Sequence, residues 1–527
     1  MSNTCLLIKN YFFNFIHKLF KNKKASGMIL PVILLATLGF SALFSFLSYY
    51  SIVTVKNENP ELAIYSFSTT GLMFAIMLIA TEGTAGLKST DEELLLSLPI
   101  KKWQIILSKI IYYFVFDFIV ILLLLFPSYI IYGIVIDGAG IDIIGRGFIF
   151  IVCISLVSNG ISGIIHTIFV RLSKRFKYSD IIQTIFSLTL VIIFVITYIG
   201  FMLVSQNMDY AMKVYDFYPI RLFSQFVLNG GLIDTIIMIC IAVLPFAISV
   251  LLRTIYFGKS IRNYHSHQQQ LIYEESTIGK TLFKKEINKY LSIPVYVTNT
   301  MMGLILGIGL IIAITIIGKE SFSTMIKTVV ASGYENGTIP ISIETMIDDY
   351  FSYIVVMVAL FTLTMAPTTA CSISIEGKEM WILKAHPISV KDVFLSKLKV
   401  NISVTIIPIC ISSILLGVNF GFAFFLVSFC TLFFASLLSG MIGLFSNLLF
   451  PKLEWESELE PVKQGIAVLL TMVLNFVFLV LPLLGFFFFS GIRVTTYLIL
   501  ISTIYVFLIV IFGGVLAKKG VKLYLNI

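Results

Sequence analysis

Twelve stretches of about 20 predominantly apolar residues recur along this chain, and they limit its fold more strongly than any other feature. A helix of about 20 residues crosses the roughly 30 Å hydrocarbon core of a bilayer, where every backbone polar group needs a partner within the protein. The content of 58% hydrophobic and 12% charged residues is also far more apolar than that of soluble domains. We therefore expect an all-α polytopic membrane protein.

The expected membrane-spanning helices are separated by short polar or glycine-containing segments. They cover residues 29–52, 62–80, 104–133, 147–170, 181–204, 232–252, 300–317, 351–371, 399–418, 421–449, 464–488 and 494–517. A turn at Gly417, Asn419 and Gly421 predicts a helical hairpin between the ninth and tenth of these helices.

Lysine and arginine are distributed unequally between alternate loops. With the N-terminus inside, the cytoplasmic segments carry 30 of the 37 basic residues. Cytoplasmic loops of membrane proteins are enriched in these residues, so the pattern predicts that both termini lie inside. The net charge of +9 then reflects topology, with attraction to anionic membrane lipid as a second effect, and does not indicate nucleic-acid binding.

One polar segment occurs twice. Residues 91–109 read DEELLLSLPIKKWQIILSK and residues 379–397 read EMWILKAHPISVKDVFLSK. An offset of 288 residues aligns the prolines and the Ser-Lys pair of the two copies. This repeat predicts two related six-helix halves, residues 1–257 and 282–527, joined by a polar linker at 258–281.

Each copy predicts a cytoplasmic helical elbow, at residues 82–103 and 376–391. A turn that only reverses the chain needs about 2 to 8 residues, whereas roughly 20 are present in each half. We therefore favour a partner-docking role over simple chain reversal. The first short helix has a capping-box spacing at Thr90 and Glu93, and Ser389 with Asp392 offers a similar start to the helix after the second elbow. The candidate docking residues are Asp91, Glu92, Pro99, Lys101, Lys102, Ser108, Lys109, Glu376, Glu379, Pro387, Lys391, Ser396 and Lys397.

An amphipathic helix is expected before the first span of each half. Apolar residues recur at helical spacing in both segments, which predicts helices that lie at the membrane surface. The expected apolar faces are Ile8, Phe12, Phe15, Ile16 and Leu19 in the first helix, and Phe283, Ile287, Tyr290 and Leu291 in the second. Pro294 is expected to break the chain before the seventh span.

Three polar residues within the expected spans form a possible intramembrane polar site, namely Asp117, Asn159 and Asn475. Charge in hydrocarbon is costly, so such side chains usually face the interior of the helix bundle. Asp117 is expected to contact substrate or a neighbouring polar group. The two asparagines are expected to form interhelical hydrogen bonds.

The sequence offers no motif for catalysis or for a bound cofactor. Gly258-Lys259-Ser260 and Gly279-Lys280-Thr281 resemble the end of a phosphate loop, but both lack the earlier glycine that this loop requires. The pair His265 and His267 is a weak metal signal, and the six cysteines form no C-x-x-C pair. We expect no enzyme activity and no bound cofactor.

The segments SLPIKKWQIILSK, SIEGKEMWILKAHPISVKDVFLSK and KKEINKYLSIPVYVTNT carry a resemblance. Together with the order of the expected helices, they resemble the permeases of type 2, or type V, ATP-binding-cassette exporters. In that family an elbow between the second and third spans is the coupling helix that docks on the ATPase subunit. The resemblance implies two copies of a separate ATPase, which bind ATP and Mg, and a location in the bacterial cytoplasmic membrane.

This chain departs from that family in two features. It contains two six-helix units, whereas many relatives carry one unit per chain, and its long outer loop at residues 205–231 has only a short counterpart at 489–493. The cargo is therefore expected only by class, as an amphipathic, lipid-like, peptide or drug substrate. A twelve-helix proton-coupled secondary transporter is the main alternative, although TEGTAGLKSTDEELLLSLP lacks the arginines typical of that class. A membrane scaffold without transport is a third possibility.

Overall fold

The computed structural model contains helices and no strands within the residues that it describes. Those residues are 3–20, 41, 45, 48, 49, 52, 60–82, 97, 99–136, 140–173, 176, 179–205, 213–256, 277–318, 327, 341–455, 458–463, 465–488 and 492–527. Among them, 11 helices are long and apolar enough to cross a membrane, and these correspond to the second to twelfth expected spans. The first expected span lies mostly outside the described residues. The chain is an all-α polytopic membrane protein.

The chain forms two compact units. Unit 1 comprises residues 1–179 and 200–267, and unit 2 comprises residues 180–199 and 268–527. Most of helix α7 (Ser179–Ser205) thus belongs to unit 2, where Thr184 donates a hydrogen bond to the carbonyl of Leu291 at 2.8 Å. Two symmetric six-helix halves remain a prediction.

Unit 1 is built around a long, glycine-containing helix, α6. Its helices are α1 (Asn3–Phe20), α3 (Glu61–Glu82), α5 (Lys102–Val135), α6 (Gly140–Ser173), α9 (Tyr218–Asn229) and α10 (Leu232–Tyr256). Helix α10 approaches α6 closely at Gly160, where a Cβ atom would lie 2.6 Å from the backbone nitrogen of Phe246. Helix α1 packs on α5, with the ring of Phe12 5.3 Å from that of Tyr112.

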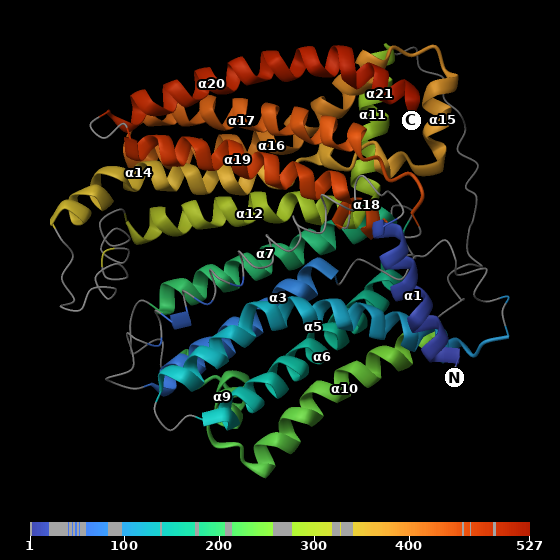
Figure 1. Ribbon diagram of the computed structural model, residues 1–527, viewed down its shortest axis with the longest axis vertical. Coiled ribbons are helices and arrows are strands. Elements are labelled where there is room, and N and C mark those ends of the chain that lie inside the picture. The colour runs from blue at the N-terminus through green and yellow to red at the C-terminus, as the bar shows by residue number, and fades with distance from the viewer. Residues whose placement is uncertain are drawn as a thin grey trace. The chain divides into compact units, whose positions relative to one another are not determined.

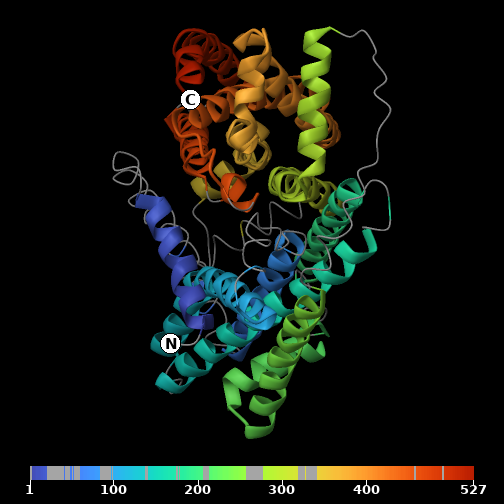
Figure 2. The ribbon, with the colours of Figure 1, turned by 90° about the vertical axis from the view of Figure 1, so that its right-hand side faces the viewer.

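Unit 2 is a bundle around α17 (Figure 1). Besides most of α7, its helices are α11 (Ile278–Ser292), α12 (Pro294–Ile317), α14 (Ile341–Thr364), α15 (Met380–Ala385), α16 (Val390–Phe420), α17 (Phe422–Leu449), α18 (Leu459–Lys463), α19 (Ile466–Phe488), α20 (Val494–Val515) and α21 (Val521–Asn526). In Figure 2 the long helices are viewed nearly along their axes, while α11 and α15 lie across that direction. Pro294 is the first residue of α12, so the expected break after α11 is confirmed.

The hairpin between α16 and α17 forms at the expected glycine. Helix α16 ends at Phe420, and Gly421 has a φ angle of +100°, which a residue with a Cβ atom rarely adopts. The backbone N–H of Gly421 donates to the carbonyl of Gly417 at 2.8 Å and closes the helix end. The sequence-based expectation of a helical hairpin is confirmed here.

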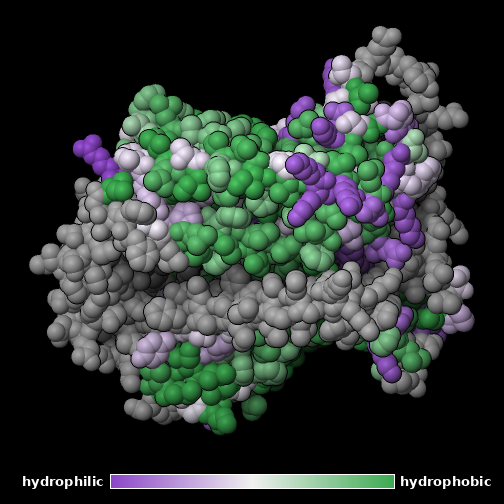
Figure 3. Space-filling model, turned by 45° about the horizontal axis from the view of Figure 1, so that its top comes forward, coloured by the Kyte–Doolittle hydropathy of each residue, from purple (hydrophilic) through white to green (hydrophobic). Residues whose placement is uncertain are grey.

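The outer surface of unit 2 is apolar along the middle of its helices (Figure 3). Large side chains such as Ile407 and Phe507 are 65% and 66% exposed there, as expected for a surface in contact with lipid. Hydrophilic residues gather at the end of the bundle that carries α15 and α21. That end of unit 2 contains the candidate site.

Candidate functional site

The site begins where the helical structure of α14, in the eighth expected span, ends. After α14 ends at Thr364, the chain forms short 3₁₀ turns at Thr368–Ala370 and Ser374–Glu379 before α15. Residues 367–377 are all buried. Buried backbone N–H and C=O groups need hydrogen-bond partners, and an interrupted helix does not supply them within itself.

Asparagine side chains from two neighbouring helices supply these partners. The side-chain oxygen of Asn401, on α16, accepts a hydrogen bond from the backbone N–H of Thr368 at 2.9 Å. The side-chain oxygen of Asn447, on α17, accepts from the N–H groups of Ile373 at 2.7 Å and Ser374 at 3.1 Å. The interrupted segment is therefore fixed to both long helices.

Asn475, on α19, also fixes the end of α14, but as a hydrogen-bond donor. Its amide nitrogen donates to the carbonyl of Thr364 at 2.7 Å and to the hydroxyl of Ser439 at 2.9 Å, which joins α19 to α14 and α17. These are interhelical bonds of the kind that the sequence predicts for this residue. Because its amide donors are occupied in this way, Asn475 fits a packing role.

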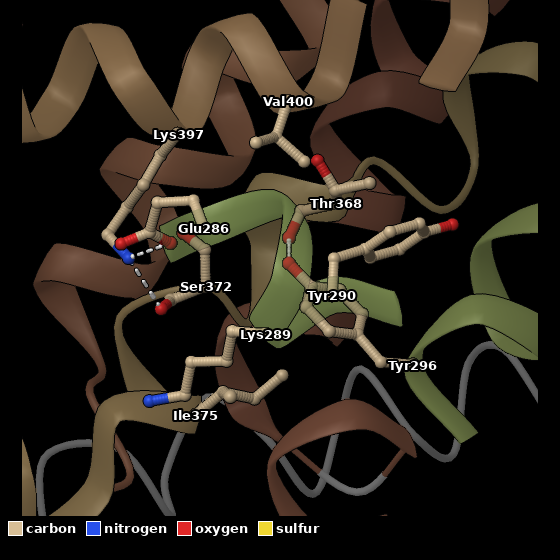
Figure 4. Close-up of a pocket in the computed structure, with 9 residues that line it drawn as sticks. All are labelled: Glu286, Lys289, Tyr290, Tyr296, Thr368, Ser372, Ile375, Lys397 and Val400. Atoms are coloured by element: carbon tan, nitrogen blue, oxygen red, sulfur yellow. Dashed lines mark hydrogen bonds and ion pairs between the residues drawn. The ribbon is translucent and has the colours of Figure 1, made fainter. Parts of the chain in front are cut away.

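A buried ion cluster lies beside the interrupted segment, and we define it as Lys285, Glu286, Lys289, Glu376 and Lys397. The ammonium of Lys397 donates to the carboxylate of Glu286 at 2.8 Å, to that of Glu376 at 3.0 Å, and to the carbonyl of Ser372 at 3.0 Å. Figure 4 shows Lys397 reaching from α16 toward Glu286 on α11. Its side chain is fully buried.

Glu376 is the centre of the cluster. It also accepts hydrogen bonds from Lys285 at 2.9 Å and Lys289 at 2.8 Å, both on α11. Its side chain is 2% exposed. Removing ions from water costs several kcal/mol per charge, and only close oppositely charged partners offset that cost. The cluster thus joins α11, the elbow and α16 through contacts that are costly to break.

Helix α11 presents a different face from the one that its sequence suggests. Leu282, Glu286 and Tyr290 are the buried residues, whereas Phe283, Ile287 and Leu291 are only partly buried. Of the expected apolar stripe, only Tyr290 is buried within the protein, and its orientation at the membrane surface stays a prediction. The signal for Glu286 was its spacing of four residues from both Leu282 and Tyr290, which places all three on one face of a helix.

Two tyrosines line the same cavity as Glu286, Lys289 and Lys397 of the cluster (Figure 4). The phenol of Tyr296 donates to the carbonyl of Thr368, and that of Tyr290 shares a hydrogen bond with the hydroxyl of Thr300 at 2.6 Å. Burial raises the pKa of Tyr290, so its phenol stays neutral. The cavity between them and Lys397 measures about 10 Å³, roughly the space of one water molecule. No cargo of the expected classes fits there.

The outward side of the elbow is exposed and partly apolar. Met380 and Leu383 of α15 are buried against the bundle, whereas Trp381 is 66% and Ile382 41% exposed. Helix α15 ends at Ala385, two residues before Pro387, as expected. In Figure 1, α15 lies beyond the ends of α16, α17 and α20, and farther out than α11.

Two further segments support α15. The indole of Trp455 donates to the carbonyl of Ser374 at 2.9 Å and covers Gly377, whose φ angle of +56° favours glycine. On the other side, the ammonium of Lys384 lies 3.4 Å from the carbonyl of Leu525 in α21. The elbow is thus held on both sides.

The expected docking residues of the second elbow separate into two groups. Glu376, Ser396 and Lys397 are buried, and Glu376 and Lys397 belong to the ion cluster, whereas Glu379, Pro387 and Lys391 are exposed. Helix α16 begins after Ser389 as expected, but the side chain of Ser389 forms no cap. The backbone of Asp392 donates to the carbonyl of Ser389 instead, at 3.0 Å.

The first elbow is described only in part. Asp91 and Glu92 lie outside the described residues, as do Thr90 and Glu93, while Pro99, Lys101 and Lys102 are exposed. Helix α5 begins at Lys102, two residues before the expected span at 104–133. Ser108 and Lys109 are buried like Ser396 and Lys397, and each serine donates to the carbonyl three residues before it at 2.8 Å.

In unit 1 the structure brings two of the intramembrane polar residues together. The amide nitrogen of Asn159, on α6, donates to the carboxylate of Asp117, on α5, at 3.3 Å. Both residues are buried, with Asn159 4% and Asp117 3% exposed. Asn475, in unit 2, belongs to a separate network.

Comparison of the chain with protein-family models, with curated proteins and with solved structures finds no match. Functional inference for this protein therefore depends on the elbow and on the buried polar groups.

Proposed function

We propose that this chain is the membrane subunit of an ATP-driven exporter whose ATPase resides on separate partner subunits. The chain itself would carry no catalytic residues, and ATP and Mg would bind to the partners. The proposal places the protein in the bacterial cytoplasmic membrane and gives it an amphipathic, lipid-like, peptide or drug cargo.

The observation that carries this proposal is the two-sided construction of the second elbow. Its outer side exposes Trp381 and Ile382 on a short helix that lies beyond the ends of α16, α17 and α20. Its inner side is joined to α11 and α16 by the ion cluster. A surface that binds a partner and is rigidly connected to a long helix can transmit movement from that partner into the bundle.

The partner surface is expected to be acidic around an apolar groove. Exposed lysines occur on and beside α15 and near α21, and complementary charges favour association and correct orientation. These lysines are Lys378, Lys384 and Lys391 around α15, and Lys518, Lys519 and Lys522 near α21. Tryptophan is also a common anchor of protein interfaces.

ATP binding would draw the two ATPase subunits together and carry the elbows with them. In unit 2, the contact of Lys397 with Glu286 and Glu376 makes α11, the elbow and the start of α16 move as one body. The interrupted segment would bend in preference to the continuous helices around it, because its backbone lacks their regular hydrogen bonds. Nucleotide binding energy would then bias the bundle between two states.

The test is to co-express the tagged chain with an ATP-binding-cassette ATPase encoded beside it, and to measure co-purification and ATP hydrolysis. Trp381→Ala should weaken ATPase association by about 2 kcal/mol, roughly 30-fold in affinity, as for a central interface anchor. Phe507→Ala is the matched control, because Phe507 is equally exposed at 66% but lies on α20, in the apolar outer surface of unit 2. The control should bind the ATPase like the unaltered chain.

Unchanged ATPase association in both Trp381→Ala and the double variant Trp381→Ala, Ile382→Asp would contradict the proposal. The secondary-transporter alternative is favoured by one observation, the buried carboxylate of Asp117 in a span of unit 1. Substrate flux in vesicles that contain the chain alone, driven by a proton gradient, would support that alternative. Flux that requires the ATPase and ATP would support the exporter.

A further inference from the structure

Asn159, which bonds to Asp117, has an incomplete set of hydrogen bonds. Asp117 lies near the middle of α5 and Asn159 on the facing side of α6, and the single bond given above joins them. The side-chain oxygen of Asn159 is buried and accepts no hydrogen bond from the described residues. A buried polar atom without a partner costs about 1–3 kcal/mol.

An ionised Asp117 cannot supply the missing bond, since a carboxylate only accepts hydrogen bonds. A protonated carboxyl can, because one oxygen carries an O–H donor while the other still accepts. The amide of Asn159 has the complementary donor and acceptor. An acid and an amide in this relation can form two hydrogen bonds, one of which supplies the donor that the amide oxygen lacks.

We propose that Asp117 binds a proton within the membrane and that Asn159 holds it there as the partner of the neutral acid. Asp117 then donates its O–H to the side-chain oxygen of Asn159, while the amide nitrogen of Asn159 donates to the other carboxyl oxygen. The pair is a proton-binding site built from α5 and α6. This site does not depend on whether an ATPase docks at the elbows.

The corresponding position in unit 2 supports a neutral group. Helices α5 and α16 begin at Lys102 and Val390, 288 residues apart, so Asp117 corresponds to Thr405. The hydroxyl of Thr405 lies 2.7 Å from that of Ser436 on α17. A hydroxyl both donates and accepts, and protonation gives Asp117 the same capacity.

The same comparison shows that packing alone does not require an acid. Ser158 of α6 donates to a carbonyl of α3, and Ser439 of α17 donates to a carbonyl of α14. These two serines therefore correspond, and the next residues, Asn159 and Gly440, correspond as well. A Cβ atom at Gly440 would lie 2.9 Å from the amide nitrogen of Asn401, which occupies that space. Unit 2 therefore packs these helices with neutral groups, and the acid with its amide partner occurs in unit 1.

Arg253 of α10 packs against α6 near this pair. Its guanidinium packs on Gly163, one helical turn from Asn159, where a Cβ atom would lie 2.7 Å from it. Among residues whose side chains the structure describes, the other ionisable groups on helices packed against α5 are Cys5, Lys9 and Tyr11 on α1; Glu61 and Tyr65 on α3; Asp142, Arg146, Cys153, His166 and Arg171 on α6; and Asp234, Cys240 and Tyr256 on α10. Those on α5 itself are Lys102, Lys109, Tyr112, Tyr113, Tyr129 and Tyr132.

Infrared spectroscopy of the purified full chain in lipid tests the proposal directly, because a protonated carboxyl has a C=O stretching band distinct from that of a carboxylate. At neutral pH the unaltered chain should show this band, and Asp117→Asn should lose it. Asn159→Leu should shift the band, since the hydrogen bonds to the amide are gone. Asp142→Asn is the control, because Asp142 is an exposed acid on α6 and its loss should leave the band unchanged.

Asp117→Thr provides a second variant that reproduces the residue of unit 2, and it should fold and also lack the band. If neither Asp117 variant folds, titration of the unaltered chain still decides, because the band must be present at neutral pH and disappear as the pH rises. Absence of a protonated carboxyl band at neutral pH overturns the proposal. A band that persists in a folded Asp117→Thr chain does the same.

Discussion

At the scale of single residues, Lys397 has the most demanding environment in the described part of unit 2. Its fully buried ammonium neutralises two carboxylates from different elements, Glu286 on α11 and Glu376 at the root of the elbow. A buried ion pair is weak evidence for net stability, but loss of one partner leaves an uncompensated charge. The contribution of this lysine is therefore best measured by removing it.

Lys397→Met is expected to destabilise the protein by about 3–5 kcal/mol, because two buried carboxylates lose their shared cation. The measurement is the midpoint of thermal unfolding of the purified chain. Lys285→Met is the matched control and should cost about 0–1 kcal/mol, since Lys285 is 38% exposed and water screens its charge. Restored stability is expected when Glu286→Gln and Glu376→Gln are combined with Lys397→Met. Equal effects of the two lysine variants would contradict the central role of Lys397.

At the scale of elements, the interrupted segment after α14 depends on side chains from other helices. Residues 367–377 are buried without regular helical bonds, and Asn447 accepts from two consecutive N–H groups in it. Non-helical backbone within a membrane protein is tolerated where the protein itself surrounds it and supplies its hydrogen bonds. The position of the elbow thus depends on α17 as well as on α16.

Asn447→Leu should loosen this segment while the long helices remain intact. Each N–H group that loses its acceptor costs about 1–3 kcal/mol, so local opening should become roughly tenfold or more frequent. Hydrogen–deuterium exchange of peptides covering residues 368–379 measures the effect. Asn419→Leu is the control, because Asn419 bonds Thr315 and the carbonyl of Leu415 at the opposite end of α16. Unaltered exchange in Asn447→Leu would show that this asparagine does not support the segment.

At the scale of the whole molecule, the two units share features that the repeat predicts. Helices α5 and α16 start at matched positions, and each carries a buried Ser-Lys pair in its third turn. In unit 1 helix α1 packs on α5, as α11 packs on α16 in unit 2. This shared local construction is consistent with the prediction of a first elbow in unit 1.

Two elbows per chain predict that one chain binds two ATPase subunits. Native mass spectrometry of the co-purified complex should show two ATPases per chain. The double variant Trp381→Ala, Lys384→Glu alters only the second elbow and should reduce the ratio to one. A single ATPase on the unaltered chain would contradict the proposed pseudo-dimer.

The sequence by itself determined the class of fold, the approximate position of most spans and the exact place of a few helix boundaries. Apolar length gave the second to twelfth spans, and the repeat gave the starts of α5 and α16. Gly421 and Pro294 marked two boundaries correctly. These features are local, since apolar length, proline and glycine act through a few neighbouring residues of the chain.

Only the tertiary structure decided which polar groups meet. Lys397 and Glu286 are 111 residues apart, Asn447 and Ile373 are 74 apart, and Asn159 and Asp117 are 42 apart. The sequence selected Lys397 and Asp117 as candidates but missed Glu286 and Asn447. Glu286 lies in a helix expected at the membrane surface, and Asn447 lies near the end of a long apolar span. A buried charge is stable only beside a partner of opposite charge or a hydrogen-bond partner, and three-dimensional packing determines that partner.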